Sequence, residues 1–245
     1  MNLRANQMAA YVAPFVVFMA LQSLVGMVKV DNPLLPWWKA GPEHWVYPLQ
    51  TIVCLGLIAW WWKNYVFKPL GMRELILACI VGFIGIALWI IPAEISTRLG
   101  LDNEWSKWLG ITSRAKSGYD PTLLADAPLA YWASVTMRFV RMTVAVALLE
   151  ELFMRGFLWR YLAHPDGEFQ NLPIGVWSLR GVVGSIVVFT FGHQVPDLLA
   201  CLMYGILISW LAWKTKSLGA CVVCHGVSNL VLGLYVMQTR QWGFW

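Results

Sequence analysis

Long apolar runs alternate with short polar segments along most of the chain, and this pattern predicts membrane-spanning helices. A spanning helix needs about 20 predominantly apolar residues, and fewer where neighbouring protein shelters it from lipid. The pattern therefore predicts an all-α fold, a polytopic membrane helix bundle with about seven to eight transmembrane helices. The apolar runs are Met8 to Val28, Tyr47 to Trp62, Leu75 to Ala93, Leu129 to Leu162, Gly181 to Val195, Leu198 to Trp213 and Leu218 to Met237.

These runs are predicted to form one integral membrane domain over residues 1–245, because no repeat, low-complexity tract or Gly/Ser linker divides them. The first run is not followed by a small-residue cleavage site, so it is interpreted as a retained helix rather than a signal peptide. The polar side chains discussed below lie in a core of about residues 128–237. The segment 94–127 precedes this core and is predicted to be extracytoplasmic.

The composition favours lipid over water as the solvent of this domain. Of the 245 residues, 59% are hydrophobic and 13% are charged, whereas soluble domains carry about 25% charged residues. The net charge of +5 comes from single basic residues between apolar runs, so there is no basic face for a nucleic acid. All five cysteines lie inside apolar runs, where they are predicted to pack as small apolar side chains rather than to form disulfides.

Lysine and arginine concentrate in alternate loops, and this distribution predicts the orientation in the membrane. Cytoplasmic loops carry an excess of these residues, so the basic loops and the N-terminus are predicted to be cytoplasmic. The basic residues of these loops are Lys63, Lys68 and Arg73, then Arg155, Arg160 and Arg180, then Lys214 and Lys216.

Polar groups that lipid would not tolerate occur in three of the predicted helices. Such groups are costly inside a membrane and mark functional sites that face the bundle interior. Four of them lie about 14 to 20 Å deep at 1.5 Å of rise per residue, counted from Arg160, Arg180 and Lys216. These four are Glu150, His193, His225 and Asn229. The sequence therefore permits a single intramembrane site. Its candidates are Glu150, Glu151 and Arg155 on the fourth run, His193 on the fifth, and His225 and Asn229 on the seventh.

Spacing separates the roles of the two adjacent carboxylates. Glu151 and Arg155 are four residues apart, so they can form an ion pair on one helix face. Glu150 points about 100° away from that face and stays free for chemistry.

Four other charged or titratable residues are interpreted as bystanders. Arg138 and Arg141 are predicted to lie near the outer membrane boundary and to extend toward water, with binding of an acidic substrate terminus as a less favoured alternative. His44 and His164 are predicted to be solvated in loops.

The same residues carry a resemblance to a known family. They resemble, in order and on separate helices, the three motifs of the CPBP family, which contains the type II CAAX prenyl proteases and the bacteriocin-processing proteins called Abi. The resemblance covers roughly Arg138 to Met237. The segment Glu150-Glu151-Leu-Phe-Met-Arg155 is similar to Glu-Glu-x-x-x-Arg, Phe189-Thr-Phe-Gly-His193 to Phe-x-x-x-His, and His225-Gly-Val-Ser-Asn229 to His-x-x-x-Asn.

The resemblance implies a glutamate-dependent intramembrane endopeptidase whose partners are the lipid bilayer and a membrane-associated protein or peptide substrate. It implies that one Glu and one His activate the attacking water, that a His and an Asn stabilise the oxyanion, and that a Glu–Arg pair holds the geometry. By position these are Glu150 with His193, His225 with Asn229, and Glu151 with Arg155, in that order.

The last residues resemble a narrower group. Gln241-Trp242-Gly-Phe-Trp245, together with His193-Gln-Val-Pro196, is similar to the bacterial CAAX prenyl protease-related proteins associated with exosortase sorting systems. This resemblance implies a multi-pass protein of a bacterial inner membrane.

Three alternatives remain beside the peptidase. Two Glu and two His could bind zinc, although the chain has no His-Glu-x-x-His motif and no cofactor is expected. The segment Cys221-Val-Val-Cys224-His225 fits the c-type haem pattern but lies in an apolar helix. A non-catalytic membrane scaffold would keep the same fold without turnover, whereas a transporter is disfavoured because no inverted repeat is present.

Overall fold

The computed structural model describes residues 3–30, 32, 35–101, 103–109 and 118–245. These residues form helices and no strands, which confirms the predicted all-α class. The α-helices are α1 (Gln7–Val28), α2 (Trp37–Ala40), α3 (Glu43–Trp60), α4 (Met72–Leu99), α5 (Glu104–Trp108), α6 (Pro128–Val140), α7 (Ala147–Glu151), α8 (Trp159–Ala163), α9 (Leu179–Phe191), α10 (Leu198–Thr215) and α11 (Leu218–Thr239).

Five helical stretches of the described chain are long and apolar enough to cross a membrane. They are Gln7–Val28, Met72–Leu99, Pro128–Ala163, Val195–Thr215 and Leu218–Thr239. The other two predicted runs are also helical, but α3 is not among the five and α9 is shorter. The chain is thus a multi-pass membrane protein. Of the expected seven to eight spans, the helices α3 and α9 do not reach the length and hydropathy of a full span.

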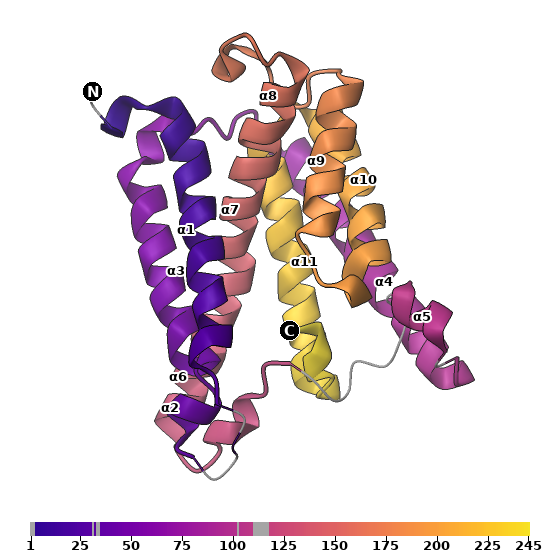
Figure 1. The fold of residues 1–245 in the computed structure, drawn as a ribbon. Helices are drawn as coiled ribbons and strands as arrows, with labels where there is room; N and C mark the ends of the chain where they lie inside the picture. The colour runs from indigo at the N-terminus through magenta and orange to yellow at the C-terminus, as the bar shows by residue number, and fades with distance from the viewer. Residues whose placement is uncertain (1–2, 31, 33–34, 102, 110–117) are drawn as a thin grey trace.

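The fourth predicted span is a single helical stretch in which two π-helical segments interrupt the α-helix. Two π-helical segments, Arg141–Val146 and Leu152–Leu158, separate α6, α7 and α8. Such wide turns are rare and are frequent at functional sites. Figure 1 shows this stretch between α1 and α3 on one side and α9 and α10 on the other, with α11 beside it. The two wide turns flank the pair of adjacent glutamates on α7.

Helix α9 reaches only part of the way across the bundle. Ser178 starts the helix by accepting a hydrogen bond from the Gly181 N–H at 3.2 Å. Thirteen residues give a length of about 20 Å, against a hydrocarbon core of about 30 Å. The helix ends at Phe191 rather than at the predicted Val195, because Gly192 follows and Pro196 has no N–H to donate. Figure 1 places the turn between α9 and α10 part way along α11.

The three loops predicted to be cytoplasmic meet at one end of the bundle. The Gly219 N–H donates to the Phe67 carbonyl at 3.1 Å, which joins the α10–α11 connection to the α3–α4 connection. Lys216 Nζ donates to the Gly175 carbonyl at 2.5 Å, which joins it to the α8–α9 connection. The shared end agrees with a shared side of the membrane, and its cytoplasmic assignment stays a prediction.

Close backbone approach fixes α11 against its neighbours. A Cβ atom on Gly226 would lie 2.8 Å from the Thr143 carbonyl oxygen in the first π-helical segment. A Cβ atom on Gly82 would lie 2.8 Å from the Cys224 carbonyl oxygen. Real Cβ atoms do not approach backbone this closely, so glycine lets α11 lie directly on α4 and on the helix that carries the glutamates.

Substituting Gly226→Ala should therefore lower the free energy of unfolding by about 1–3 kcal/mol, the usual cost of overpacking. The measurement is thermal unfolding of the purified protein in neutral detergent. Gly26→Ala is the matched control, because a Cβ atom there meets nothing within 4 Å and alanine favours a helix more than glycine does. Equal unfolding temperatures for the two variants would contradict this account of the α11 interface.

Candidate active site

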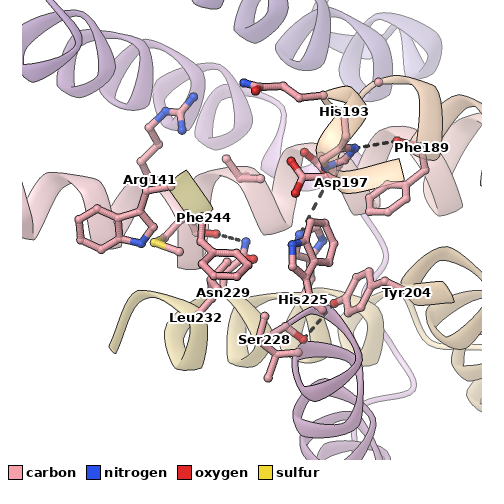
Figure 2. A pocket seen from close by; sticks show the side chains of 18 of the residues that line it. Arg141, Phe189, His193, Asp197, Tyr204, His225, Ser228, Asn229, Leu232 and Phe244 are labelled. Carbon is pink, nitrogen blue, oxygen red and sulfur yellow. Dashed lines mark hydrogen bonds and ion pairs between the residues drawn. The ribbon is translucent and has the colours of Figure 1, made fainter. Parts of the chain in front are cut away.

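Side chains from the three motif-bearing segments line one cavity of about 370 Å³, a volume within the usual range for ligand sites. Glu150 reaches it from α7, His193 from the turn after α9, and His225 and Asn229 from α11. Figure 2 shows His193, His225 and Asn229 around this space. The structure thus brings together the four residues whose depths in the membrane were predicted to match.

Glu151 and Arg155 lie behind the cavity and not in its wall. Arg155 Nη1 donates to Glu151 Oε1 at 3.2 Å, and both side chains are fully buried. The guanidinium carbon of Arg155 also lies 5.3 Å from the centre of the Phe189 ring. The predicted i,i+4 contact is therefore present, and within the described chain Glu150 forms no ion pair with this arginine.

His225 connects the two glutamates. Its Nδ1 lies 2.9 Å from Glu151 Oε1, and its Nε2 lies 3.9 Å from Glu150 Oε2. The first contact is a hydrogen bond in which Nδ1 donates to the carboxylate, so the tautomer of the ring is fixed in the way that a carboxylate orients a catalytic imidazole. The second distance is too long for a hydrogen bond. Nε2 therefore faces Glu150 across a gap.

His193 lies beyond the end of α9 and not on the helix as predicted. The turn still keeps its Nδ1 2.7 Å from the Phe189 carbonyl oxygen, the contact drawn in Figure 2. A carbonyl can only accept, so Nδ1 carries the proton and Nε2 of the neutral ring is left as an acceptor. Trp89 packs edge-on against the ring at 6.1 Å. The ring is held from both sides, with an acceptor nitrogen available for chemistry.

Asn229 fixes its position through the first π-helical segment. Its Nδ2 donates to the Met142 carbonyl oxygen at 2.7 Å, a carbonyl in the wide turn Arg141–Val146. Because an amide nitrogen carries two protons, the second N–H of Asn229 is left for another acceptor. One residue earlier on the same helix, the Ser228 hydroxyl lies within hydrogen-bond distance of the Gly82 and Cys224 carbonyl oxygens, at 2.9 and 3.0 Å.

The interpretation of Arg138 and Arg141 as boundary residues that extend toward water is wrong. Their exposed fractions are 8% and 7%, and both line the cavity that contains Glu150. Aromatic rings from α3 and from the chain end cover them, which gives each guanidinium an alternative to water. His44, predicted to be solvated, is also buried, and its Nδ1 lies 2.8 Å from Ser134 Oγ. His164 is exposed as predicted.

Other cavity residues lie outside the three motifs. Tyr204 of α10 donates to Ser228 Oγ at 3.2 Å and lies 5.6 Å from the His225 ring centre. A single aromatic residue in a chain this apolar carries no periodic signal, so only tertiary packing identifies Tyr204. Phe244 and Trp245 reach the cavity from the segment after α11, and they belong to the ending that resembles the narrower group.

The described residues contain no group of three or more His, Cys, Asp and Glu side chains arranged to hold a metal ion.

A helical membrane protein with carboxylate, imidazole and amide groups converging on a cavity between its helices has the arrangement of an intramembrane hydrolase. Residues 132–231 match the family model for type II CAAX prenyl endopeptidase, Rce1-like. The matched range is less than half of the chain but contains all three motifs, so the resemblance to this family is confirmed over that range. The family is one of membrane-embedded proteases. No curated protein and no solved structure matches the chain significantly.

Proposed function

We propose that the protein is an intramembrane glutamic endopeptidase that hydrolyses a peptide bond of a membrane-associated protein or peptide in a bacterial inner membrane. One observation supports this most directly: Glu150 Oε2 has no hydrogen-bond partner among the described residues, although it faces His225 Nε2 across 3.9 Å inside the cavity. A buried carboxylate oxygen without a partner is costly, and an activated water or a substrate group would satisfy it.

In the proposed reaction, Glu150 removes a proton from a water molecule as that water attacks the substrate carbonyl carbon. His193 assists through its acceptor nitrogen Nε2, which can hold the same water in position. The tetrahedral intermediate then collapses, and Glu150 returns the proton to the leaving amine. No cofactor takes part in these steps.

His225 and Asn229 are proposed to stabilise the oxyanion of that intermediate. A protonated His225 would keep Glu151 as its anionic partner at Nδ1 and would donate to the oxyanion through Nε2. Asn229 would donate through its second N–H. Donors that are already in place act strongly in a water-poor site. Glu151 and Arg155 do not touch the substrate in this scheme, and they are proposed to position His225.

The decisive experiment compares protein termini in the host membrane proteome between wild type and Glu150→Gln. The change keeps the size of the side chain and removes the base, so specific new termini should disappear while the protein level holds. Glu168→Gln is the matched control, since Glu168 is exposed in the α8–α9 connection. Identical termini in wild type and Glu150→Gln would favour the non-catalytic scaffold and withdraw the catalytic roles.

Chelation separates the proposal from its zinc-dependent alternative. Cleavage of a peptide that spans one of the identified sites should persist in excess chelator, and the purified protein should contain no stoichiometric metal by elemental analysis. Loss of cleavage that added zinc restores would support the metal-dependent mechanism instead.

A further inference from the structure

Two buried arginines at one end of the cavity have no acidic partner. Within the described part of the chain, neither Arg138 nor Arg141 forms an ion pair, although each is more than nine-tenths buried. Two guanidinium groups three residues apart repel each other, and a buried charge without a paired anion is unfavourable. Glu43 attracts Arg138 and Glu150 attracts Arg141 at longer range, but neither carboxylate contacts a guanidinium. A further anion in direct contact would therefore stabilise the two arginines.

Aromatic rings surround the guanidinium of Arg138. Its guanidinium carbon lies 5.4 Å from the Tyr47 ring centre, 5.0 Å from that of Tyr119 and 5.6 Å from that of Trp245. Its Nε is buried and has no hydrogen-bond partner among the described residues. A guanidinium carries its N–H groups in its own plane, and the edge that contains Nε matches a carboxylate in the two-pronged geometry that arginine favours.

Arg141 is more strongly tied to the protein. Its Nε donates to Gln50 Oε1 at 2.9 Å and its Nη2 to Gln22 Oε1 at 2.7 Å. Both acceptors are neutral amides, so these bonds hold the side chain without neutralising its charge. Figure 2 shows Arg141 at the opposite end of the pocket from Phe189 and Tyr204. This second guanidinium adds positive potential beside Arg138.

We propose that Arg138, supported by Arg141, binds a carboxylate of the substrate and thereby sets the position of the cleaved bond. This proposal rests on the proposed function, and it specifies the substrate as a peptide that carries a carboxylate at a fixed distance from the cleaved bond. The two arginines precede Glu150 by 12 and 9 residues on one helical stretch, which corresponds to about 18 and 14 Å along its axis. An extended peptide advances about 3.3 Å per residue. The carboxylate therefore lies about four to six residues from the bond that faces Glu150.

Binding can be measured without turnover, so failure of the carboxylate proposal can be distinguished from failure of the proposed reaction. The assay uses the full chain with Glu150→Gln in neutral maltoside micelles. The probes are fluorescein-labelled apolar nonapeptides that carry one Glu at successive positions, each paired with its Gln counterpart, with a free or an amidated C-terminus. Fluorescence anisotropy gives the affinities, and the Gln counterpart corrects for partition into micelles.

We expect one or two adjacent Glu positions, or the free C-terminus, to tighten binding about tenfold over the neutral counterpart, the effect of a charge-assisted hydrogen bond. A gain that follows the Glu position and survives amidation identifies a side chain as the source of the carboxylate. A gain that amidation removes identifies the C-terminus. If the protein that retains both arginines binds every Glu peptide and its Gln counterpart with equal affinity, at both kinds of C-terminus, the proposal is overturned.

Two further variants test which residue carries the gain. Arg138→Gln should abolish it, and Arg138→Lys should keep only part of it, because lysine retains the charge but not the planar fork. Arg73→Gln is the charge-matched control. Arg73 is exposed at the start of α4, so this variant should keep the full gain in affinity. A gain that persists in folded Arg138→Gln would assign the carboxylate to another site and overturn the proposal.

Discussion

Arg155→Leu should lower the free energy of unfolding by about 3–5 kcal/mol, the cost of breaking a buried ion pair by removing one partner. Arg155 and Glu151 are fully buried and joined at 3.2 Å. Without Arg155, the charge of Glu151 keeps only His225 as a hydrogen-bond partner among the described residues. The measurement is reversible unfolding of the purified protein in mixed micelles, followed by tryptophan fluorescence.

The double variant Glu151→Leu with Arg155→Leu separates lost charge pairing from lost packing. Removing both charges leaves no uncompensated ion, so this protein should recover a large part of the stability that the single variant loses. It should not recover cleavage, because His225 would lose the carboxylate that orients its ring. A single Arg155→Leu variant as stable as wild type would show that the pair contributes nothing to the fold.

Sequence spacing was sufficient to predict this pair and the convergence around it. Two residues four apart on a helix share a face whatever the rest of the protein does. The depth count placed Glu150, His225 and Asn229 at a similar level, and the structure brings all three to one cavity. His225 and Asn229 lie on the continuous helix α11. For Glu150 the count crosses one π-helical segment, which changes the rise too little to separate it from the other two. These predictions used only the rise and rotation of an α-helix, which the apolar pattern indicates directly.

Arg138 and Arg141 were misplaced because the helix that carries them is not uniformly wound. In an ideal α-helix, nine residues rotate the chain by about 900°, which places Arg141 on the face opposite to Glu150. The π-helical segment Arg141–Val146 lies between them, and its wider turns rotate each residue by a smaller angle. Arg141 and Glu150 consequently reach the same cavity. A change of winding leaves no mark in an apolar pattern, so only the structure reveals it.

His193 shows a different limit. The apolar run continues through Val195, so hydropathy alone extends the helix past the histidine. The backbone ends it at Phe191, and the turn that follows lies inside the membrane because α9 is too short to cross it. Polar backbone at this depth is tolerated only where protein or a polar cavity surrounds it. The cavity beside His193 provides such a place.

Asn229→Ala should lower kcat by about 10²–10³, the usual effect of removing one donor to an oxyanion, while KM changes little. The amide is proposed to act on the intermediate and not on the bound substrate, so the loss belongs to kcat. The assay uses a peptide that spans a cut site found from the termini comparison. Unfolding measured in parallel should show only a small loss, from the one hydrogen bond to Met142.

Ser228→Ala is the control that distinguishes a displaced α11 from the loss of a donor to the oxyanion. Ser228 neighbours Asn229 on α11, lines the same cavity and makes its own hydrogen bonds to backbone carbonyls, but it has no proposed contact with the intermediate. Its loss should cost stability and leave kcat within a few fold. If Ser228→Ala reduced kcat as much as Asn229→Ala, both effects would reflect a displaced α11, and the oxyanion role of Asn229 would have to be given up.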